Sequence, residues 1–253
     1  MLEQDSKISL NFADSVSYDR RIRRFVPYYD EMMDLILACA QERNGFEILE
    51  LGCGTGSFSH RVLDTFPRAR LTAIDLVQEM VDCCRNRLAD SAGRAEVIQA
   101  DLINFSQPRS FDCVLSNLAL HYPETDAKKI RACWNVFESL RSGGCLCFSV
   151  MLAGPTDEHT QAMWRAWEED VLMNGVAREE IEQWYRVYHP YDYPVPPGAW
   201  LKWLGDVGFD DCRLVWFRSV FGAIQAHKTQ AVVAESGAKP ARLFAPQPPL
   251  EIR

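Results

Sequence analysis

A glycine-rich segment, Gly52-Cys53-Gly54-Thr55-Gly56, directly follows the apolar run 46–51, which has the pattern of a buried strand. Glycine lets the backbone turn sharply and lets a ligand approach main-chain atoms that a Cβ would otherwise shield. A helical pattern begins at once, so the unpaired N–H groups of its first turn should face the same ligand. This combination indicates a loop that binds a small polar or charged molecule.

Two acidic residues lie at equivalent places in the next two strand patterns. Asp75 ends the run 70–75, where a carboxylate can accept hydrogen bonds from both hydroxyls of a ribose. Asp101 ends the run that starts at residue 95, where its carboxylate and an adjacent N–H can bind the edge of an adenine. Open α/β sheets bind ligands at the carboxyl ends of their strands. The glycine-rich loop and the two acids therefore predict a nucleoside site, although either acid alone would be typical of a helix N-cap.

The glycine spacing separates this site from one for a dinucleotide. The dinucleotide fingerprint requires a third glycine at position 57, where this chain has Ser57, and the third glycine is Gly56 instead. A nicotinamide-dependent reductase is therefore the poorer alternative.

Strand and helix patterns alternate along the chain, which predicts right-handed βαβ crossovers and a mostly parallel sheet. The remaining patterns are strands at 111–116 and 145–150, helices at 78–89, 126–140 and 200–207, and a turn at Ser142-Gly143-Gly144. Two last strand patterns, 211–217 and 220–227, are separated by only two residues, which permits an antiparallel hairpin and excludes a parallel crossover. We expect an α/β fold with a Rossmann-like, doubly wound sheet that ends in this hairpin.

Three segments lie outside the alternating pattern. We expect an N-terminal helical segment at 1–44, an insertion at 154–199 within the main domain 45–228, and a flexible tail at 229–253. Because aromatic side chains offer large, rigid contact surfaces, the insertion is predicted to be a helical and aromatic lid over an acceptor molecule. Its proline-rich run 188–197 is predicted to be a non-helical loop lining the pocket. The aromatic residues are Trp164, Trp167, Trp184, Tyr185, Tyr188, Tyr191, Tyr193 and Trp200, of which Trp164 and Trp167 equally fit the core stripe of a helix.

The residues 50–56, Asp75, the run 99–102 and the terminal hairpin resemble the class I S-adenosylmethionine-dependent methyltransferases over about residues 45–228. The resemblance implies S-adenosyl-L-methionine as the cofactor and leaves the acceptor open. It implies cofactor contacts for the following residues: Glu50, Gly52, Cys53, Gly54 and Gly56 beside the methionine portion, Asp75 on the ribose, Leu76 and Met80 flanking the adenine, and Asp101 with Leu102 at its amino edge.

The N-terminal segment is similar to that of several small-molecule methyltransferases. It also resembles a bacterial subgroup that makes or uses carboxy-S-adenosylmethionine for tRNA wobble-uridine modification, in which an Arg or Tyr closes over the cofactor's carboxylate. The resemblance implies that Tyr18, Arg24 and Tyr29 close over the cofactor in the same way. The tyrosines equally fit simple helix packing, and Gly54-Thr55-Gly56 keeps the ordinary form of the loop.

Asn117 and His121 follow the fourth strand pattern, in a loop that faces the reactive methyl in this fold. Methyl transfer displaces an excellent leaving group, so the protein mainly orients and desolvates its reactants. A base is required only where the acceptor loses a proton. His121 is the candidate catalytic base because imidazole titrates near neutral pH, with pocket wall as its alternative role. His189 is a second candidate base, and Asn117 is expected to orient the loop or the methionine backbone.

Composition limits the class of protein. The 253 residues are 47% hydrophobic and 25% charged, which is ordinary for a globular protein. The formal net charge of −8 disfavours nucleic-acid binding, despite one basic group at 20–24. No apolar run reaches the ~18 residues of a membrane span and the N-terminus lacks a signal-peptide pattern, so we expect a cytoplasmic protein without membrane contact. Nine cysteines without a CxxC pair and five scattered histidines predict no metal site.

These features predict an enzyme that methylates an O, N or C nucleophile of a small, aromatic or apolar molecule. Two alternatives stay open: a carboxy-S-adenosylmethionine-related tRNA-modification enzyme, and a non-catalytic S-adenosylmethionine-binding partner protein. The sequence does not distinguish a monomer from a homodimer.

Overall fold

The chain folds around one seven-stranded sheet with the strand order β3-β2-β1-β4-β5-β7-β6. The computed structural model describes residues 15–40, 46–91 and 93–229. Neighbouring strands are parallel from β3 to β5, whereas β7 is antiparallel to both β5 and β6. The predicted doubly wound α/β sheet with a terminal antiparallel hairpin is confirmed. The strands are β1 (Glu47–Leu51), β2 (Arg70–Asp75), β3 (Ala95–Gln99), β4 (Phe111–Asn117), β5 (Leu140–Met151), β6 (Asp210–Arg218) and β7 (Phe221–His227).

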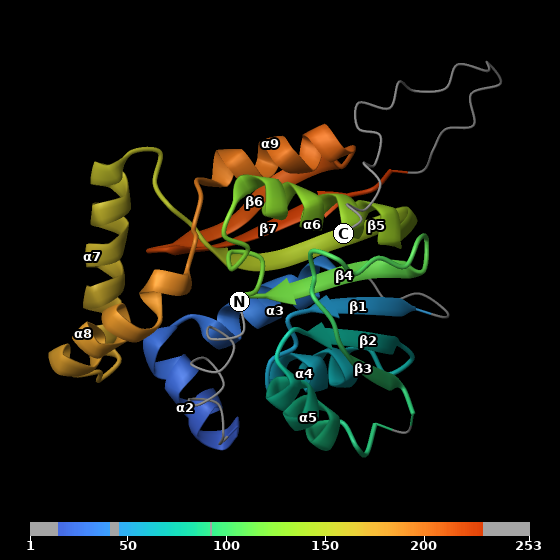
Figure 1. Ribbon diagram of the computed structural model, residues 1–253, viewed down its shortest axis with the longest axis horizontal. Coiled ribbons are helices and arrows are strands. Elements are labelled where there is room, and N and C mark those ends of the chain that lie inside the picture. Colours follow the sequence, from blue (N-terminus) through green and yellow to red (C-terminus); the bar gives the residue numbers. More distant parts are fainter. Residues whose placement is uncertain (1–14, 41–45, 92, 230–253) are drawn as a thin grey trace, which may run out of the picture.

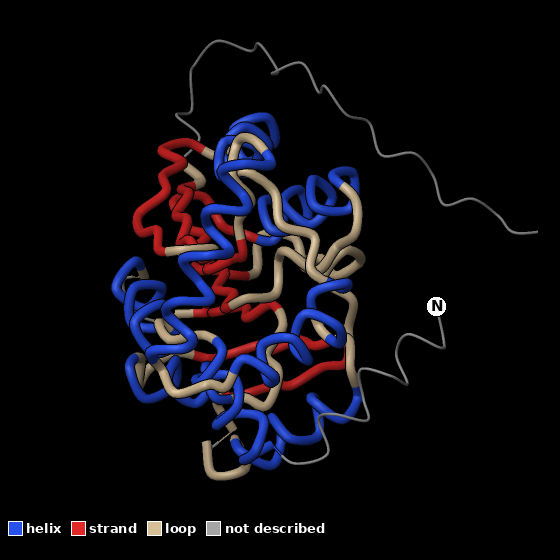
Figure 2. Tube along the Cα trace, turned by 90° about the vertical axis from the view of Figure 1, so that its left-hand side faces the viewer, coloured by secondary structure: helices blue, strands red, loops and turns tan. Residues whose placement is uncertain are grey.

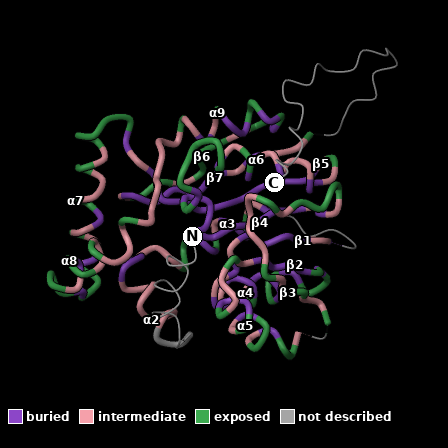
Figure 3. Tube along the Cα trace, in the orientation of Figure 1, coloured by how far each residue is buried: buried purple, intermediate pink, exposed green. Residues whose placement is uncertain are grey.

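Helices cover both faces of the sheet (Figure 1). One face packs against α3 (Tyr29–Cys39), α4 (Ser57–Thr65) and α5 (Gln78–Arg87), and the other against α6 (Asp126–Ser139) and α9 (Pro197–Val207). Successive side chains of a strand point to opposite faces, so Ile48 joins the first core cluster while Leu49 and Leu51 join the second. Burial on both faces explains why these strands read as nearly continuous apolar runs, and Figure 3 shows the central strands as buried.

The predicted turn at Ser142-Gly143-Gly144 is wrong, because β5 already begins at Leu140. The N–H of Gly143 donates to the carbonyl of Lys228 at 2.7 Å, and the N–H of Lys228 donates to the carbonyl of Gly144 at 2.9 Å. These bonds continue the antiparallel pairing of β5 beyond the end of β7. Long-range pairing therefore overrides the local preference of the two glycines for a turn.

The proline-rich run 188–197 also differs from its prediction. A short 3₁₀ helix, η1 (His189–Tyr191), lies within it, and α9 begins at Pro197 rather than near residue 200. Proline fits the first position of a helix, where its missing N–H has no partner to lose. The residues between η1 and α9 are not helical, as predicted.

Two helices of the insertion, α7 (Asp157–Met173) and α8 (Arg178–Val187), lie beside α2 (Ser15–Phe25). We call residues 157–193 the cap. Figure 2, viewed from the cap side, shows helices in front of the strand ends. The indole N–H of Trp167 donates to the carbonyl of Phe25 at 2.9 Å and its side chain is 1% exposed, so α7 and α2 share one core cluster. The tail from residue 230 and residues 1–14 lie outside the described residues.

Replacing Trp167 by Phe should lower the free energy of unfolding by about 2 kcal/mol or more, because a buried carbonyl loses its donor and ring atoms are removed. Trp164→Phe removes the same atoms at a half-buried position of the same helix and should cost less than half as much. Urea unfolding of the two variants measures the difference. Equal losses would show that the bond to Phe25 contributes nothing.

Candidate functional site

A cavity of about 650 Å³ lies at the carboxyl ends of β1, β2 and β4, between the sheet, α2 and the cap. Of the predicted cofactor-binding residues and the candidate base His121, only Arg24 and Gly56 do not line this cavity. The lining set is Tyr18, Tyr29, Glu50, Gly52, Cys53, Gly54, Asp75, Leu76, Met80, Asp101, Leu102, Asn117 and His121. Residues that are far apart in the sequence therefore meet at the carboxyl ends of the strands, as predicted.

The three glycines of the loop have different roles, although all have positive φ. A Cβ at Gly52 would lie 2.3 Å from the Cβ of Ala119, and one at Gly56 would lie 2.9 Å from Sγ of Cys84. Those two glycines allow close packing inside the protein. A Cβ at Gly54 would meet no atom within 4 Å, so only Gly54 faces open space that a ligand can approach.

Asp75 fastens the loop to the end of β2. Its Oδ2 accepts the N–H of Gly54 at 2.8 Å, and its Oδ1 accepts the N–H of Val77 at 2.9 Å. Burial raises the pKa of Asp75, and these two hydrogen bonds oppose that shift. Each carboxylate oxygen keeps a second lone pair, so Asp75 can hold the loop and still accept a ribose hydroxyl.

Asp101 also holds a turn while lining the cavity. Its Oδ1 accepts the N–H of Ile103 at 2.9 Å and its Oδ2 accepts the Asn104 amide at 3.1 Å, which fixes the turn after β3. Near it, Leu76 lines the cavity although its side chain is 55% exposed. An exposed apolar side chain beside Met80 and Leu102 provides the walls of a slot for a flat ring.

Glu50 and Asn117 present unsatisfied polar atoms to the cavity. Oε2 of Glu50 and Nδ2 of Asn117 make no hydrogen bond within the described part of the chain. Glu50 is 1% exposed, and burial raises its pKa to about 8. An acceptor and a donor on neighbouring strands match the ammonium and carboxylate of an α-amino acid. This is the chemistry expected for the methionine end of the cofactor.

Comparison with known proteins agrees with this arrangement. Residues 48–144 match the family model described as a methyltransferase domain. Malonyl-[acyl-carrier protein] O-methyltransferase of Bacillus cereus is 26% identical over 160 residues, which cover 63% of this chain and 58% of the relative. The protein of the same name from Methylococcus capsulatus is 32% identical over 138 residues, covering 54% and 48%. Residues 48–144 therefore belong to a methyltransferase domain.

Solved structures show the same fold. Phosphoethanolamine N-methyltransferase 2 of Haemonchus contortus, in complex with phosphomonomethylethanolamine and S-adenosylhomocysteine, superposes with a TM-score of 0.60 at 13% identity. The superposition covers 80% of this chain and 53% of that one. The chain spans about half the length of the curated relatives described above, 58% of the Bacillus cereus protein and 48% of the Methylococcus capsulatus protein.

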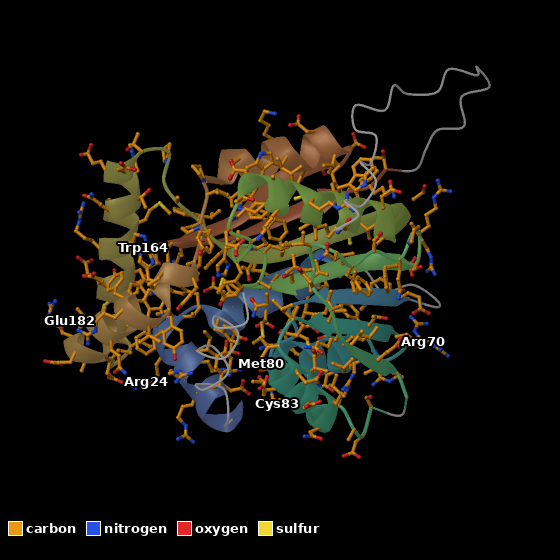
Figure 4. The ribbon with its side chains drawn as sticks, viewed as in Figure 1. Arg24, Arg70, Met80, Cys83, Trp164 and Glu182 are labelled. Atoms are coloured by element: carbon orange, nitrogen blue, oxygen red, sulfur yellow. The ribbon has the colours of Figure 1, made fainter. Side chains whose placement is uncertain are left out.

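Two predicted cofactor-binding residues, Gly56 and Arg24, lie outside the cavity lining. Arg24 donates two hydrogen bonds of 2.8 Å to the carboxylate of Glu180 and lies beside α8 (Figure 4). It therefore braces α2 against the cap and lies outside the cavity that is predicted to bind the cofactor. Arg21 lines the cavity instead. Helical spacing explains the error, because residues 18, 21, 22 and 25 share one face of α2 and position 24 does not.

The aromatic residues of the insertion divide into two groups. Trp184, Tyr188, Tyr191 and Tyr193 line the cavity, as predicted for a lid. The others pack in the interior, Trp164, Trp167 and Tyr185 within the cap and Trp200 in the core against Phe148. His189 also faces the cap interior, with its ring 4.8 Å from that of Trp164, so it is not placed to act as a base in the cavity.

His121 makes an interaction that the sequence did not indicate. Its Nε2 lies 3.4 Å from Oδ1 of Asp192, which follows η1 in the cap. Both side chains line the cavity and are almost completely buried. The two residues are far apart in the sequence, and no local pattern could have paired them.

Among the described residues, no three His, Cys, Asp or Glu side chains are grouped so as to hold a metal ion. None of the described helices is both long and apolar enough to cross a membrane.

We expect Glu50→Gln to stabilise the protein increasingly as the pH rises from 5 to 7. The folded-state pKa of Glu50 is about 8 against an ordinary 4.5. Protonated Glu50 therefore contributes its full stabilisation below the pKa that Glu50 has in the unfolded chain. This contribution is lost as the pH rises through the pKa of Glu50 in the folded protein. The difference between variant and wild type should grow by roughly 1.4 kcal/mol per pH unit. Urea unfolding at both pH values measures it, and a pH-independent difference would contradict the burial of an ionisable Glu50.

Gly52→Ala should destabilise the protein by about 3 kcal/mol or more, because positive φ and overlap with Ala119 both oppose the added methyl group. Gly54→Ala, with the same kind of φ but open space, should cost only about 1 kcal/mol. Chemical denaturation of both variants tests the distinction. A larger loss for Gly54→Ala would overturn the packing role assigned to Gly52.

Proposed function

We propose that this protein transfers the methyl group of S-adenosylmethionine to an O, N or C nucleophile of a small aromatic or apolar molecule. One observation carries the proposal: a single cavity joins nucleoside- and amino-acid-binding groups to an aromatic wall. S-adenosylmethionine supplies an activated methyl group on a sulfonium, and the residues of this chain bind, orient and enclose the reactants.

We call the part of the cavity next to the glycine-rich loop and Asp75 the cofactor half. Its side chains lie at the ends of successive strands and match the chemical groups of S-adenosylmethionine. Asp75 faces the ribose, Leu76 and Met80 face the adenine, and Glu50 faces the ammonium of the methionine part. A cation beside Glu50 favours its ionised form, so binding near neutral pH removes the proton that burial retains there. One structure of the same fold was solved with S-adenosylhomocysteine, which supports a cofactor of this class.

Helix α2 closes the site from the side opposite the sheet. Asp19 accepts hydrogen bonds of 2.6 Å from both the Thr55 hydroxyl and the Arg87 guanidinium, which ties α2 to the glycine-rich loop. Tyr18 and Tyr29 line the cavity next to this tie. Burial raises the pKa of Tyr29 to about 12, so its hydroxyl stays neutral and can donate. This enclosure excludes water from the reactants.

The acceptor half is walled by aromatic and apolar side chains. Phe25, Tyr122, Trp184, Tyr188, Tyr191 and Tyr193 line it. Such surfaces bind flat or apolar molecules with little loss of conformational entropy. An enclosed pocket of this kind favours an enzyme over a non-catalytic partner protein, for which an exposed apolar docking surface is expected.

Calorimetric titration with S-adenosylmethionine, followed by a screen of small aromatic acceptors, tests the proposal. The expected result is saturable binding at one site and production of S-adenosylhomocysteine with at least one acceptor. Binding without turnover across the screen would instead favour the non-catalytic alternative. Absence of binding would contradict the cofactor assignment.

A carboxylated form of the cofactor is the second candidate, and one observation favours it. The guanidinium carbon of Arg21 lies 5.8 Å from the ring centre of Tyr18 and 5.5 Å from that of Tyr188, in the lining of the same cavity. A guanidinium there is suited to pair with an added carboxylate. Mass spectrometry of ligand co-purified with the protein distinguishes the two cofactors.

Leu76→Ala should weaken S-adenosylmethionine binding about three- to tenfold without changing the stability of the free protein. Its exposed side chain gains burial only when an adenine covers it. Met173→Ala is the matched control, because Met173 is 80% exposed on α7 and does not line the cavity. Calorimetry measures both, and equal affinities for the two variants would remove Leu76 from the adenine site.

A further inference from the structure

The pair formed by His121 and Asp192 joins the loop after β4 to the cap. Their side chains are 2% and 5% exposed, and Nε2 of His121 lies 3.4 Å from Oδ1 of Asp192. Both residues line the acceptor half of the cavity. A carboxylate buried this deeply is costly unless its oxygens are hydrogen-bonded.

The other ring nitrogen of His121 is already occupied. The last paired residues of β4 and β5 are Asn117 and Ser149, so the N–H of Met151 lies beyond the end of β4. Nδ1 of His121 accepts that N–H at 3.4 Å. Nδ1 is therefore the acceptor, and Nε2 carries the proton on the side of the ring that faces Oδ1 of Asp192. To act as a base, His121 would have to give up its bond to Met151.

Asp192 keeps one oxygen for a ligand. Oδ1 faces His121, whereas Oδ2 is buried and makes no hydrogen bond within the described residues. An unsatisfied buried carboxylate oxygen is unfavourable, because it has lost its contact with water without gaining a hydrogen bond. A hydrogen-bond donor on a molecule in the cavity would remove that cost. Tyr191 and Tyr193, on either side of Asp192 in the chain, also line the cavity and would contact the same molecule.

We infer that Asp192, rather than His121, is the base of the methyl transfer, that His121 is its positioning residue, and that the acceptor is an aromatic hydroxyl. This inference rests on the methyl transfer proposed above. A neutral hydroxyl satisfies Oδ2 and meets no repulsion from the sulfonium, whereas an ammonium group would place a second positive charge beside it.

The proposed methyl transfer needs only the acceptor hydroxyl, the sulfonium and Asp192. The acceptor oxygen forms a bond to the methyl carbon, and the bond between that carbon and sulfur breaks with its electron pair remaining on sulfur. The hydroxyl proton moves to Oδ2 of Asp192. The Nε2–H of His121 stabilises the Asp192 carboxylate in the geometry that accepts this proton.

The test compares phenols with arenethiols of the same ring skeleton at pH 9. An arenethiol has already lost its proton at this pH and needs no base, whereas most phenols retain theirs. Asp192→Asn should lower kcat for the phenols about 100-fold or more and change the arenethiol rate less than threefold. His121→Gln should lower the phenol rate less than Asp192→Asn, again sparing the arenethiols. Glu182→Gln, an exposed acid on α8 (Figure 4), is the control and should change neither rate.

The other outcomes are also decisive. An equal loss with phenols and arenethiols would overturn the assignment of Asp192, because it would reveal a structural role only. Methylation of amines but of no phenol by the wild type would overturn the acceptor class. Calorimetric titration with S-adenosylmethionine separates these results from failure of the proposed function. The variants should bind S-adenosylmethionine as tightly as the wild type does. If the wild type itself does not bind it, the proposed methyl transfer is refuted.

Discussion

The loop after β1 is attached to the end of β2 by hydrogen bonds, and the geometry of the site depends on this attachment. The carbonyl of Ile74 accepts the N–H groups of Gly52 and Cys53 at 2.8 and 2.9 Å, and Asp75 accepts that of Gly54 at 2.8 Å. Backbone N–H groups that leave a parallel sheet must find partners when they are buried. Satisfying them here fixes the loop in a shape that only glycine permits.

Two further attachments close the cavity around that loop. Asp19 ties α2 to Thr55 and Arg87, while Arg24 ties the same helix to Glu180 of the cap. Helix α2 therefore contacts both the cofactor half and the acceptor half of the enclosure. Exposed ion pairs contribute little stability by themselves, so we attribute the docking of the cap mainly to the shared core around Trp167 and Phe25.

Local patterns predicted the sheet, and most of the residues they indicated for the cofactor line one cavity. Strand ends such as Leu51 and Asp75 follow from apolar periodicity, and the glycine-rich loop follows from residue type. The errors occur where distant segments decide the outcome. Gly143 is in a strand because Lys228 pairs with it, and Asp192 meets His121 only because the cap folds back over β4. Arg24 is a different case, since helical spacing within α2 already favoured Arg21 for the cavity.

The proposed site requires a nucleoside to be held across the ends of β1, β2 and β3. A crystal structure of the protein with S-adenosylhomocysteine tests this arrangement most directly. We expect ribose hydroxyls on Asp75, adenine between Leu76 and Met80, and the amino-acid end at Glu50 and Asn117. A ligand bound elsewhere, or side chains filling the space between the strand ends while the ligand is present at saturating concentration, would contradict it.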